Sequence, residues 1–246
     1  MPALYGLIGY PLSHSFSPAY FKKKFAELRI DAAYRPFPLA GVNEFVPLLK
    51  ANPDILGLNV TIPYKESIIS YLDEIDEVAE KIGAVNCISI KKGTKKGYNT
   101  DTTGFEQSLV PLLTLQHTDA LVLGTGGSSK AVAYVLDKLG VRFMTVSRYI
   151  AGGGITYGEL TPEIIAQHKL IINTTPLGMY PNPDGLPDIP YDAIGKDHLL
   201  YDLIYNPEET KFLLKGKENN AAIKNGFEML KLQADASWDI WMDQAW

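Results

Sequence analysis

The stretch Leu121-Val-Leu-Gly-Thr-Gly-Gly-Ser-Ser-Lys-Ala131 decides the fold of this chain. Residues 120–123 are apolar and predict a buried strand, and residues 128–139 continue with apolar side chains at helical spacing. The glycines between them predict a turn whose backbone can lie close to a ligand, because glycine has no side chain and tolerates a positive φ.

This turn is suited to hold an anion. The first N–H groups of the helix that follows have no partners within the helix, and they attract negative charge. Gly124, Gly126 and Gly127 in a strand–turn–helix unit therefore predict a cradle for the pyrophosphate of a dinucleotide. Ser129 stands at the third glycine position of G-x-G-x-x-G, so a glycine-rich turn without a cofactor is the alternative.

The composition excludes several classes of protein. The chain has 246 residues, 46% of them hydrophobic and 21% charged, as in ordinary globular proteins with one large or two modest domains. A formal charge of −5 argues against nucleic acid as a partner, since the only dense basic run, residues 91–96, reads as a hairpin turn. The single Cys87 fits a reducing cytoplasm. We expect no metal, membrane span or signal peptide, because the four histidines are scattered and long apolar runs are missing.

The N-terminal part begins with a predicted strand over residues 4–9. Ser17 is then a good N-cap, followed by Pro18, for a helix over residues 20–28. The hydroxyls of Ser15 and Ser17 beside a helix start are suited to a small carboxylate. Simple capping explains the same residues.

Two further segments carry polar residues at informative places. A helix at 42–50 and a strand at 55–60 precede Lys65, which we expect in the first turn of the next helix. The helix dipole disfavours a lysine there, so Lys65 has either a function or only a surface position. Asn86 interrupts an apolar run at 82–90 that predicts a strand, and its amide is satisfied either by backbone or by a ligand.

The second half alternates strands and helices. Asp101 is expected to cap a helix over 103–113. A strand over 141–147 ends at Arg148, about 20 residues beyond Gly124, where an arginine accommodates the 2′-phosphate of NADP. Further strands begin at residues 170 and 199, and helices are expected over 211–214 and from 226 onward. The predicted class is α/β with parallel sheets.

At this point the chain resembles the shikimate dehydrogenase family over nearly its whole length. The stretches that carry the resemblance are Gly9-x-Pro-x-x-His-Ser-x-Ser-Pro18, Asn59-Val-Thr-Ile-Pro-Tyr-Lys-Glu66, Gly83-Ala-Val-Asn86, Asn99-Thr-Asp101, the glycines at 124–127, Ile172-Asn-Thr-Thr-Pro-Leu-Gly-Met179, Tyr205-x-Pro207 and Asn225-Gly-Phe-Glu-Met-Leu230 with Gln233. Each is weak alone, but eight in the right order are specific.

The resemblance implies an N-terminal α/β substrate domain and a Rossmann-like dinucleotide-binding domain, with a cleft between them. The first would comprise residues 1–100 and 226–246, and the second residues 101–225. It also implies a cytoplasmic enzyme of aromatic amino-acid and chorismate biosynthesis, a monomer or homodimer. This enzyme would reduce 3-dehydroshikimate to shikimate reversibly with NADP(H).

The resemblance also implies roles for single residues. Lys65 would handle the proton as acid or base, with Asp101 orienting it. The substrate carboxylate would bind Ser15 and Ser17 with Tyr205 nearby, and the ring hydroxyls would bind Thr61, Asn86, Asp101 and Gln233. The cofactor would contact Gly124, Thr125, Gly126, Gly127, Ser128, Ser147, Arg148, Thr174, Leu203 and Gly226.

Some residues depart from the family pattern. Cys87 stands where threonine is usual, and we read it as a core residue rather than a nucleophile. Ser147-Arg148-Tyr149 replaces Asn-Arg-Thr, and a second arginine is missing, although Arg148 still predicts NADP. The alternatives are an NAD-using quinate/shikimate dehydrogenase and a non-catalytic homologue that senses metabolites. Keeping both Lys65 and Asp101 argues against the second.

Overall fold

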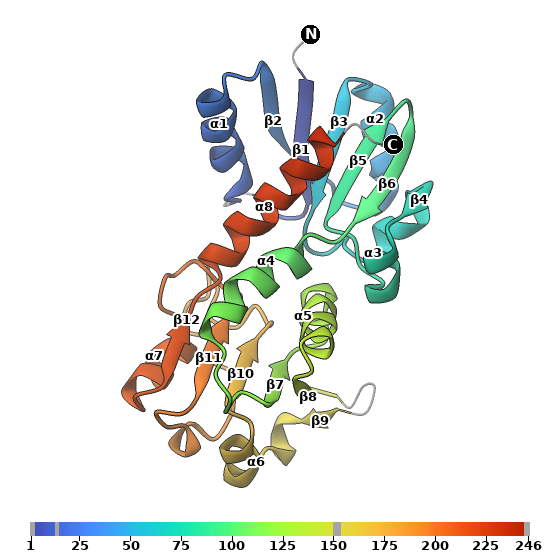
Figure 1. Cartoon of the computed structure of the whole chain (residues 1–246). Helices are drawn as coiled ribbons and strands as arrows, with labels where there is room; N and C mark the ends of the chain where they lie inside the picture. The colour runs from blue at the N-terminus through green and yellow to red at the C-terminus, as the bar shows by residue number, and fades with distance from the viewer. Residues whose placement is uncertain (1–2, 13–14, 150–153, 244–246) are drawn as a thin grey trace. The chain divides into compact units, whose positions relative to one another are not determined.

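The computed structural model describes residues 3–12, 15–149 and 154–243. The chain separates into two compact units (Figure 1): Met1–Thr100 with Ala234–Trp246 form the first, and Asp101–Gln233 form the second. The family resemblance implied that the chain leaves the second domain at residue 226. The observed division falls between Gln233 and Ala234, inside the last helix.

The first unit is built on a mixed sheet of six strands in the order β2-β1-β3-β5-β6-β4. β1 pairs in parallel with β2 and β3, and β5 pairs antiparallel with β3 and β6. The strands are β1 (Ala3–Gly9), β2 (Ala32–Pro38), β3 (Ile55–Val60), β4 (Glu74–Ile75), β5 (Cys87–Lys91) and β6 (Thr94–Tyr98). The helices are α1 (Ser17–Leu28), α2 (Phe45–Ala51) and α3 (Glu77–Ile82), with 3-10 turns at Val42–Glu44 and Ser67–Tyr71.

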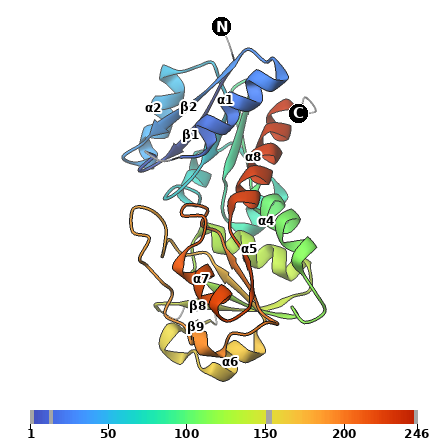
Figure 2. The ribbon, with the colours of Figure 1, turned by 90° about the vertical axis from the view of Figure 1, so that its left-hand side faces the viewer.

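Apolar residues cover both faces of this sheet. Phe45 of α2 packs with strand residues on one face. On the other, Phe21 and Phe25 of α1 join Trp238 and Trp241 from the final helix, α8 (Phe227–Met242), and Figure 2 shows α1 and α2 on opposite sides of β1. Trp241 lies where a side chain on Gly57 would be, because a Cβ added there would be 2.3 Å from the indole nitrogen.

The second unit has an all-parallel sheet in the order β12-β11-β10-β7-β8-β9. Its strands are β7 (Asp119–Leu123), β8 (Arg142–Ser147), β9 (Ile155–Thr156), β10 (Leu170–Asn173), β11 (Leu199–Asp202) and β12 (Ala222–Lys224). Its helices are α4 (Asp101–Leu109), α5 (Gly127–Lys138), α6 (Pro162–Gln167), α7 (Lys211–Glu218) and the first part of α8, with 3-10 turns at Val110–Leu112, Tyr157–Glu159 and Tyr191–Ala193.

Helices cover both faces of this second sheet. Ala120 and Val122 of β7 pack with α4 and α5, whereas Leu121 and Leu123 pack on the other face with α6 and α7. Successive side chains of a strand point to opposite faces, so the buried run of β7 contributes to two hydrophobic cores. The predicted α/β class is confirmed.

Four local predictions were wrong. Residues 82–86 do not form a strand, because α3 ends at Ile82 and β5 begins only at Cys87. Lys65 lies in a turn before a 3-10 helix rather than in the first turn of an α-helix. Ser17 is not the N-cap, since α1 begins at Ser17 itself, and the helix expected over 103–113 begins at Asp101.

The described residues also bear on two expected absences. None of their helices is long and apolar enough to cross a membrane. In the same ranges, no three His, Cys, Asp or Glu side chains are grouped so that they could hold a metal ion.

Two buried histidines share one local motif near the start of the parallel strands. The Thr114 N–H donates to Nδ1 of His117 and the Gly195 N–H to Nδ1 of His198, each at 3.0 Å. Their Nε2–H groups are then the donors, and that of His198 reaches the Ile165 carbonyl at 3.1 Å. Burial lowers the pKa of both side chains, and each is neutral in the native state near neutral pH.

We therefore expect the pair to make stability depend on pH. A histidine with a lowered pKa contributes its full stability above the ordinary value of 6.5 and loses it as pH falls toward the lowered value. His198→Asn keeps an acceptor for the Gly195 N–H but cannot be protonated. Relative to the wild type, its free energy of unfolding in urea should rise by roughly 1 kcal/mol between pH 7.5 and 5.5. A constant difference between the two proteins would contradict this.

Candidate functional site

The glycine turn after β7 is tightly held at its first position. Gly124 has φ of 115°, and its N–H donates to the Val146 carbonyl at 2.8 Å. A Cβ added to Gly124 would be 2.6 Å from Oγ1 of Thr174. Both the backbone angle and the close neighbour require glycine here.

The second part of the turn is open. Gly126 is the N-cap of α5 with φ of −80° and ψ of −178°, and no side chain caps the helix. A Cβ added to Gly126 would meet nothing within 4 Å. A helix start that no side chain caps and empty space beside it together fit the pyrophosphate of a dinucleotide.

Ser129 explains why the third glycine is missing. Its side chain is buried, and its hydroxyl donates to the Gly124 carbonyl at 2.7 Å. The serine thus satisfies a polar group of the turn that α5 does not reach. The departure from G-x-G-x-x-G supports the turn instead of disrupting it.

Backbone contacts bring other predicted cofactor residues to the same edge of the sheet. The N–H and the hydroxyl of Thr174 both donate to the Leu123 carbonyl, at 2.9 and 2.7 Å. The Leu203 N–H donates to the Asn173 carbonyl at 3.0 Å. Gly226 lies against Leu203 so closely that an added Cβ would be 2.0 Å from its carbonyl oxygen.

Arg148 follows the end of β8, the strand beside β7. Its side chain is exposed, and it lies near Tyr157, whose pKa is raised by burial and lowered by the Arg148 charge. The Tyr157 hydroxyl is buried and has no hydrogen-bond partner in the described part of the chain. The Ser147 hydroxyl donates to the Tyr149 carbonyl and so holds the turn that presents Arg148.

In the first unit, predicted substrate residues take part in a buried polar network. Ser17 hydrogen-bonds to the Tyr34 hydroxyl, which donates to Oδ1 of Asn59 at 2.8 Å. Nδ2 of Asn59 donates to the Ser237 hydroxyl at 2.8 Å. The Ser237 hydroxyl in turn lies 3.1 Å from Oγ1 of Thr100.

Asn86 is joined to this network through Thr100. Oδ1 of Asn86 accepts from the Thr100 N–H at 2.6 Å, and its Nδ2 donates to the Thr100 hydroxyl at 3.0 Å. The amide is therefore satisfied partly within the protein, which is one of the two interpretations that the sequence allowed. Its predicted role toward a substrate hydroxyl stays a prediction.

The other predicted substrate and catalytic residues are all at least partly buried. The Ser15 hydroxyl donates to the Leu12 carbonyl at 3.1 Å, and residues 13 and 14 of that motif lie outside the described residues. Thr61 and Lys65 are half-buried, as is Tyr205. Asp101 is buried, and Nε2 of Gln233 donates to the Leu230 carbonyl at 2.9 Å.

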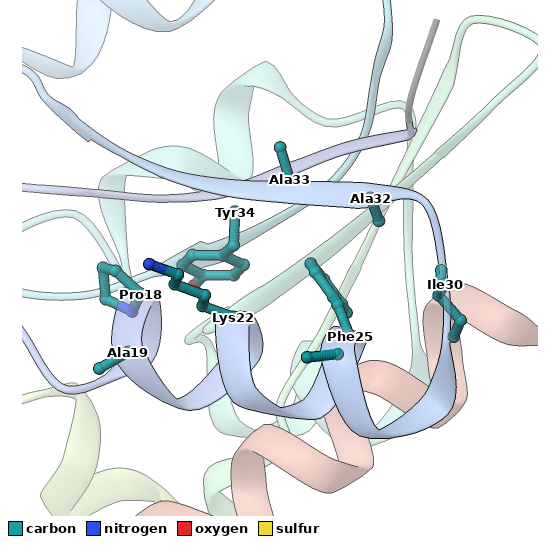
Figure 3. A pocket seen from close by; sticks show the side chains of 9 residues that line it. Pro18, Ala19, Lys22, Phe25, Ile30, Ala32, Ala33 and Tyr34 are labelled. Carbon is teal, nitrogen blue, oxygen red and sulfur yellow. The ribbon is translucent and has the colours of Figure 1, made fainter.

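A groove of about 540 Å³ lies between α1 and β2 in the first unit (Figure 3). Its walls are mostly apolar, with Pro18, Phe25 and Ile30 among them, and among the described residues that line it only Lys22 is charged. A polyol needs several hydroxyl or amide partners, which this groove does not offer. It is not the predicted substrate site.

Comparison with known proteins decides the family. A profile described as the shikimate dehydrogenase substrate binding domain matches residues 7–88. The shikimate dehydrogenase (NADP(+)) of Clostridium beijerinckii is 43% identical over 252 residues, covering 97% of this chain and 92% of that protein. The chain belongs to the shikimate dehydrogenase family.

Solved structures of shikimate dehydrogenases have the same fold. That of Aquifex aeolicus has a TM-score of 0.88 and 35% identity, and the match covers 98% of this chain and 92% of the other. That of Thermus thermophilus, in complex with NADP(H) and shikimate, has a TM-score of 0.87 and 27% identity, with 97% and 93% covered.

Within this shikimate dehydrogenase fold, four members of the polar network were not predicted from the sequence: Tyr34, Asn59, Thr100 and Ser237. Asn59 and Thr100 lie inside stretches that carried the family resemblance, and this was the signal that could have found them. Tyr34 and Ser237 lie in none of them. The role of Cys87 as a core residue agrees with its full burial, which raises the pKa of its thiol to about 12.

The two glycines of the turn should respond differently to alanine. Gly124→Ala forces a strained φ and a contact with Thr174, so we expect it to lower the free energy of unfolding by about 1–3 kcal/mol. Gly126→Ala has a permitted φ and empty space, so thermal unfolding should be near wild type. Its methyl group would nevertheless occupy the cradle and weaken NADPH binding by about tenfold or more, measured by NADPH fluorescence. Unchanged NADPH binding in Gly126→Ala would contradict the assignment of the pyrophosphate to this turn.

Proposed function

We propose that this protein is an NADP-dependent shikimate dehydrogenase, which reduces 3-dehydroshikimate to shikimate reversibly. The observation that carries the proposal lies in the second unit. There an open glycine turn and Arg148 follow two neighbouring parallel strands, and ligands of such sheets bind at this edge. The family membership supplies the substrate class.

For the substrate, we assign the carboxylate to Ser15, Ser17 and the start of α1, with Tyr205 nearby. No side chain caps α1, and its first turn carries no acidic residue, so its N–H groups favour an anion. The Ser17 hydroxyl would have to turn from Tyr34 to donate to a carboxylate. Thr61, Asn86, Asp101 and Gln233 are assigned to the ring hydroxyls.

For the chemistry, we assign the proton to Lys65. NADPH, when bound, supplies the hydride that reduces the substrate carbonyl. Negative charge then develops on the carbonyl oxygen, and the Lys65 ammonium stabilises this charge and donates a proton to the oxygen. Asp101 orients the ammonium, and in the reverse direction the neutral lysine accepts the proton of the alcohol.

For the cofactor, we assign the pyrophosphate to residues 124–128 and the 2′-phosphate to Arg148, with Ser147 beside it. Thr174, Leu203 and Gly226 would line the remaining path of the dinucleotide. We assign substrate binding to residues 1–100 with the C-terminal helix, and NADP binding to the remainder. The protein would act in the cytoplasm as a monomer or homodimer, without nucleic acid.

The direct test follows the absorbance of the reduced cofactor after shikimate or quinate is mixed with the protein and either NADP or NAD. We expect NADP reduction with shikimate and much slower reaction with quinate or NAD. Comparable rates with quinate and NAD would favour the alternative dehydrogenase. Cofactor binding without turnover of any of these pairs would favour a metabolite sensor.

Arg148→Ala should separate the two cofactors. Loss of a charged contact to a phosphate should raise KM for NADP by about tenfold or more, while KM for NAD stays near wild type, because NAD has no 2′-phosphate. Steady-state kinetics with both cofactors measure this. An equal rise for both would show that Arg148 does not read the phosphate.

Lys65→Ala should remove the proton donor. We expect kcat to fall by about two to four orders of magnitude, the range of a lost general acid. Shikimate affinity should change much less, because the contact counts mainly in the transition state. Asp101→Ala should also lower kcat, and the double variant should be much less impaired than the product of the single effects. Turnover near wild type in Lys65→Ala would overturn the assignment.

A further inference from the structure

Asp202 is a wholly buried carboxyl at the end of β11 that the proposed reaction does not use. Three groups donate to it: Nδ2 of Asn173 at 3.0 Å, the Ile204 N–H at 3.0 Å and the Thr210 hydroxyl at 2.6 Å. Burial raises the pKa of Asp202 to about 7, and these hydrogen bonds oppose a further rise. A buried carboxyl is costly unless it is hydrogen-bonded, and these three donors offset that cost.

The partners of Asp202 lie at the ends of the two loops that follow β10 and β11. Asn173 ends β10, Ile204 follows β11, and Thr210 is the N-cap of α7, where its hydroxyl also accepts from the Leu213 N–H. One side chain thus ties together the segments that leave neighbouring strands at one edge of the sheet.

Two chains of hydrogen bonds, here called arms, lead away from Asp202, one through Asn173 and one through Thr210. The arm through Asn173 leads to the glycine turn. Oδ1 of Asn173 accepts from the Thr175 N–H at 3.0 Å and from its hydroxyl at 2.7 Å. Between these residues, Thr174 holds the Leu123 carbonyl and lies against Gly124. The oxygen of the Asn173 amide is therefore fixed by the 173–175 loop, and its nitrogen donates to Asp202 at 3.0 Å and, over a longer distance of 3.4 Å, to the Leu177 carbonyl.

We propose that Asp202 is a positioning residue for the dinucleotide: by holding the Asn173 amide it fixes residues 173–175 as the wall of the glycine cradle. This inference rests on the proposed binding of NADP. The arm through Thr210 leads instead to α7 and away from the cradle. The two arms allow a positioning role to be separated from a general effect on stability.

The test compares variants of the full chain by NADPH fluorescence titration. Asp202→Ala should weaken NADPH binding by about tenfold. Asp202→Asn keeps an oxygen for Asn173 and should restore the affinity to within about threefold of wild type. Thr210→Val removes a buried hydrogen bond of the same carboxyl, so it should lower the melting temperature but leave the NADPH Kd within about twofold.

The following outcomes would contradict the positioning role of Asp202 or the proposed function. NADPH affinity near wild type in Asp202→Ala, or a loss in Thr210→Val as large as in Asp202→Ala, overturns the positioning role. If Asp202→Ala does not fold, Asn173→Ala breaks the same arm and should show the same tenfold loss; normal binding there overturns the inference. A wild type that binds no NADPH would instead refute the proposed function itself.

Discussion

The buried hydroxyl of Ser237 is the contact on which the first unit depends. It links Asn59 of β3 to Thr100, the last residue before α4, and it comes from the C-terminal helix. An unpaired buried polar group is costly, so each member of the network fixes the position of the next. The Trp241 indole, which donates to the Ile88 carbonyl at 2.9 Å, ties the same helix to β5. Ser17 and Asn86, predicted from sequence to bind substrate, are held by this network.

The second unit depends on how its parallel strands end. The N–H of Gly124, Thr174 and Leu203 each donates to a carbonyl of the neighbouring strand's end, which extends the sheet's pattern by one residue before the loops diverge. The backbone is therefore fixed at the point where the cradle begins. Beyond it, at Gly126, a Cβ would meet nothing within 4 Å, so the turn is open there. Rigidity and openness at adjacent residues are what a site for a large anion requires.

Local sequence signals predicted what local physics determines. The strand at 55–60 has the expected bounds, and the glycine turn, α5 and the hairpin at residues 91–94 form where expected. The family resemblance located Asn59 and Thr100 without giving them a role. β2 was missed because it is an edge strand with two prolines, and the two-residue β9 exists only through its pairing with β8.

The remaining errors have a tertiary cause. Residues 82–86 are as apolar as a strand, but α3 begins at the Asp76 cap and Gly83 ends it with a positive φ. Tyr34 could not be recognised, because its partners Ser17 and Asn59 lie on different elements that only the sheet brings together. Long-range hydrogen bonds of this kind leave no periodic trace in a sequence.

The participation of both ends of the chain in the first unit has a consequence during synthesis. Residues 101–233 form a compact unit whose strands and helices are all made before Ala234 is added. The first unit, although made earlier, still lacks Ser237, Trp238 and Trp241 at that stage, so one apolar face of its sheet is only partly covered and Nδ2 of Asn59 lacks its hydroxyl acceptor. On the ribosome, the part of the protein that is translated first is therefore the part that completes its folding last.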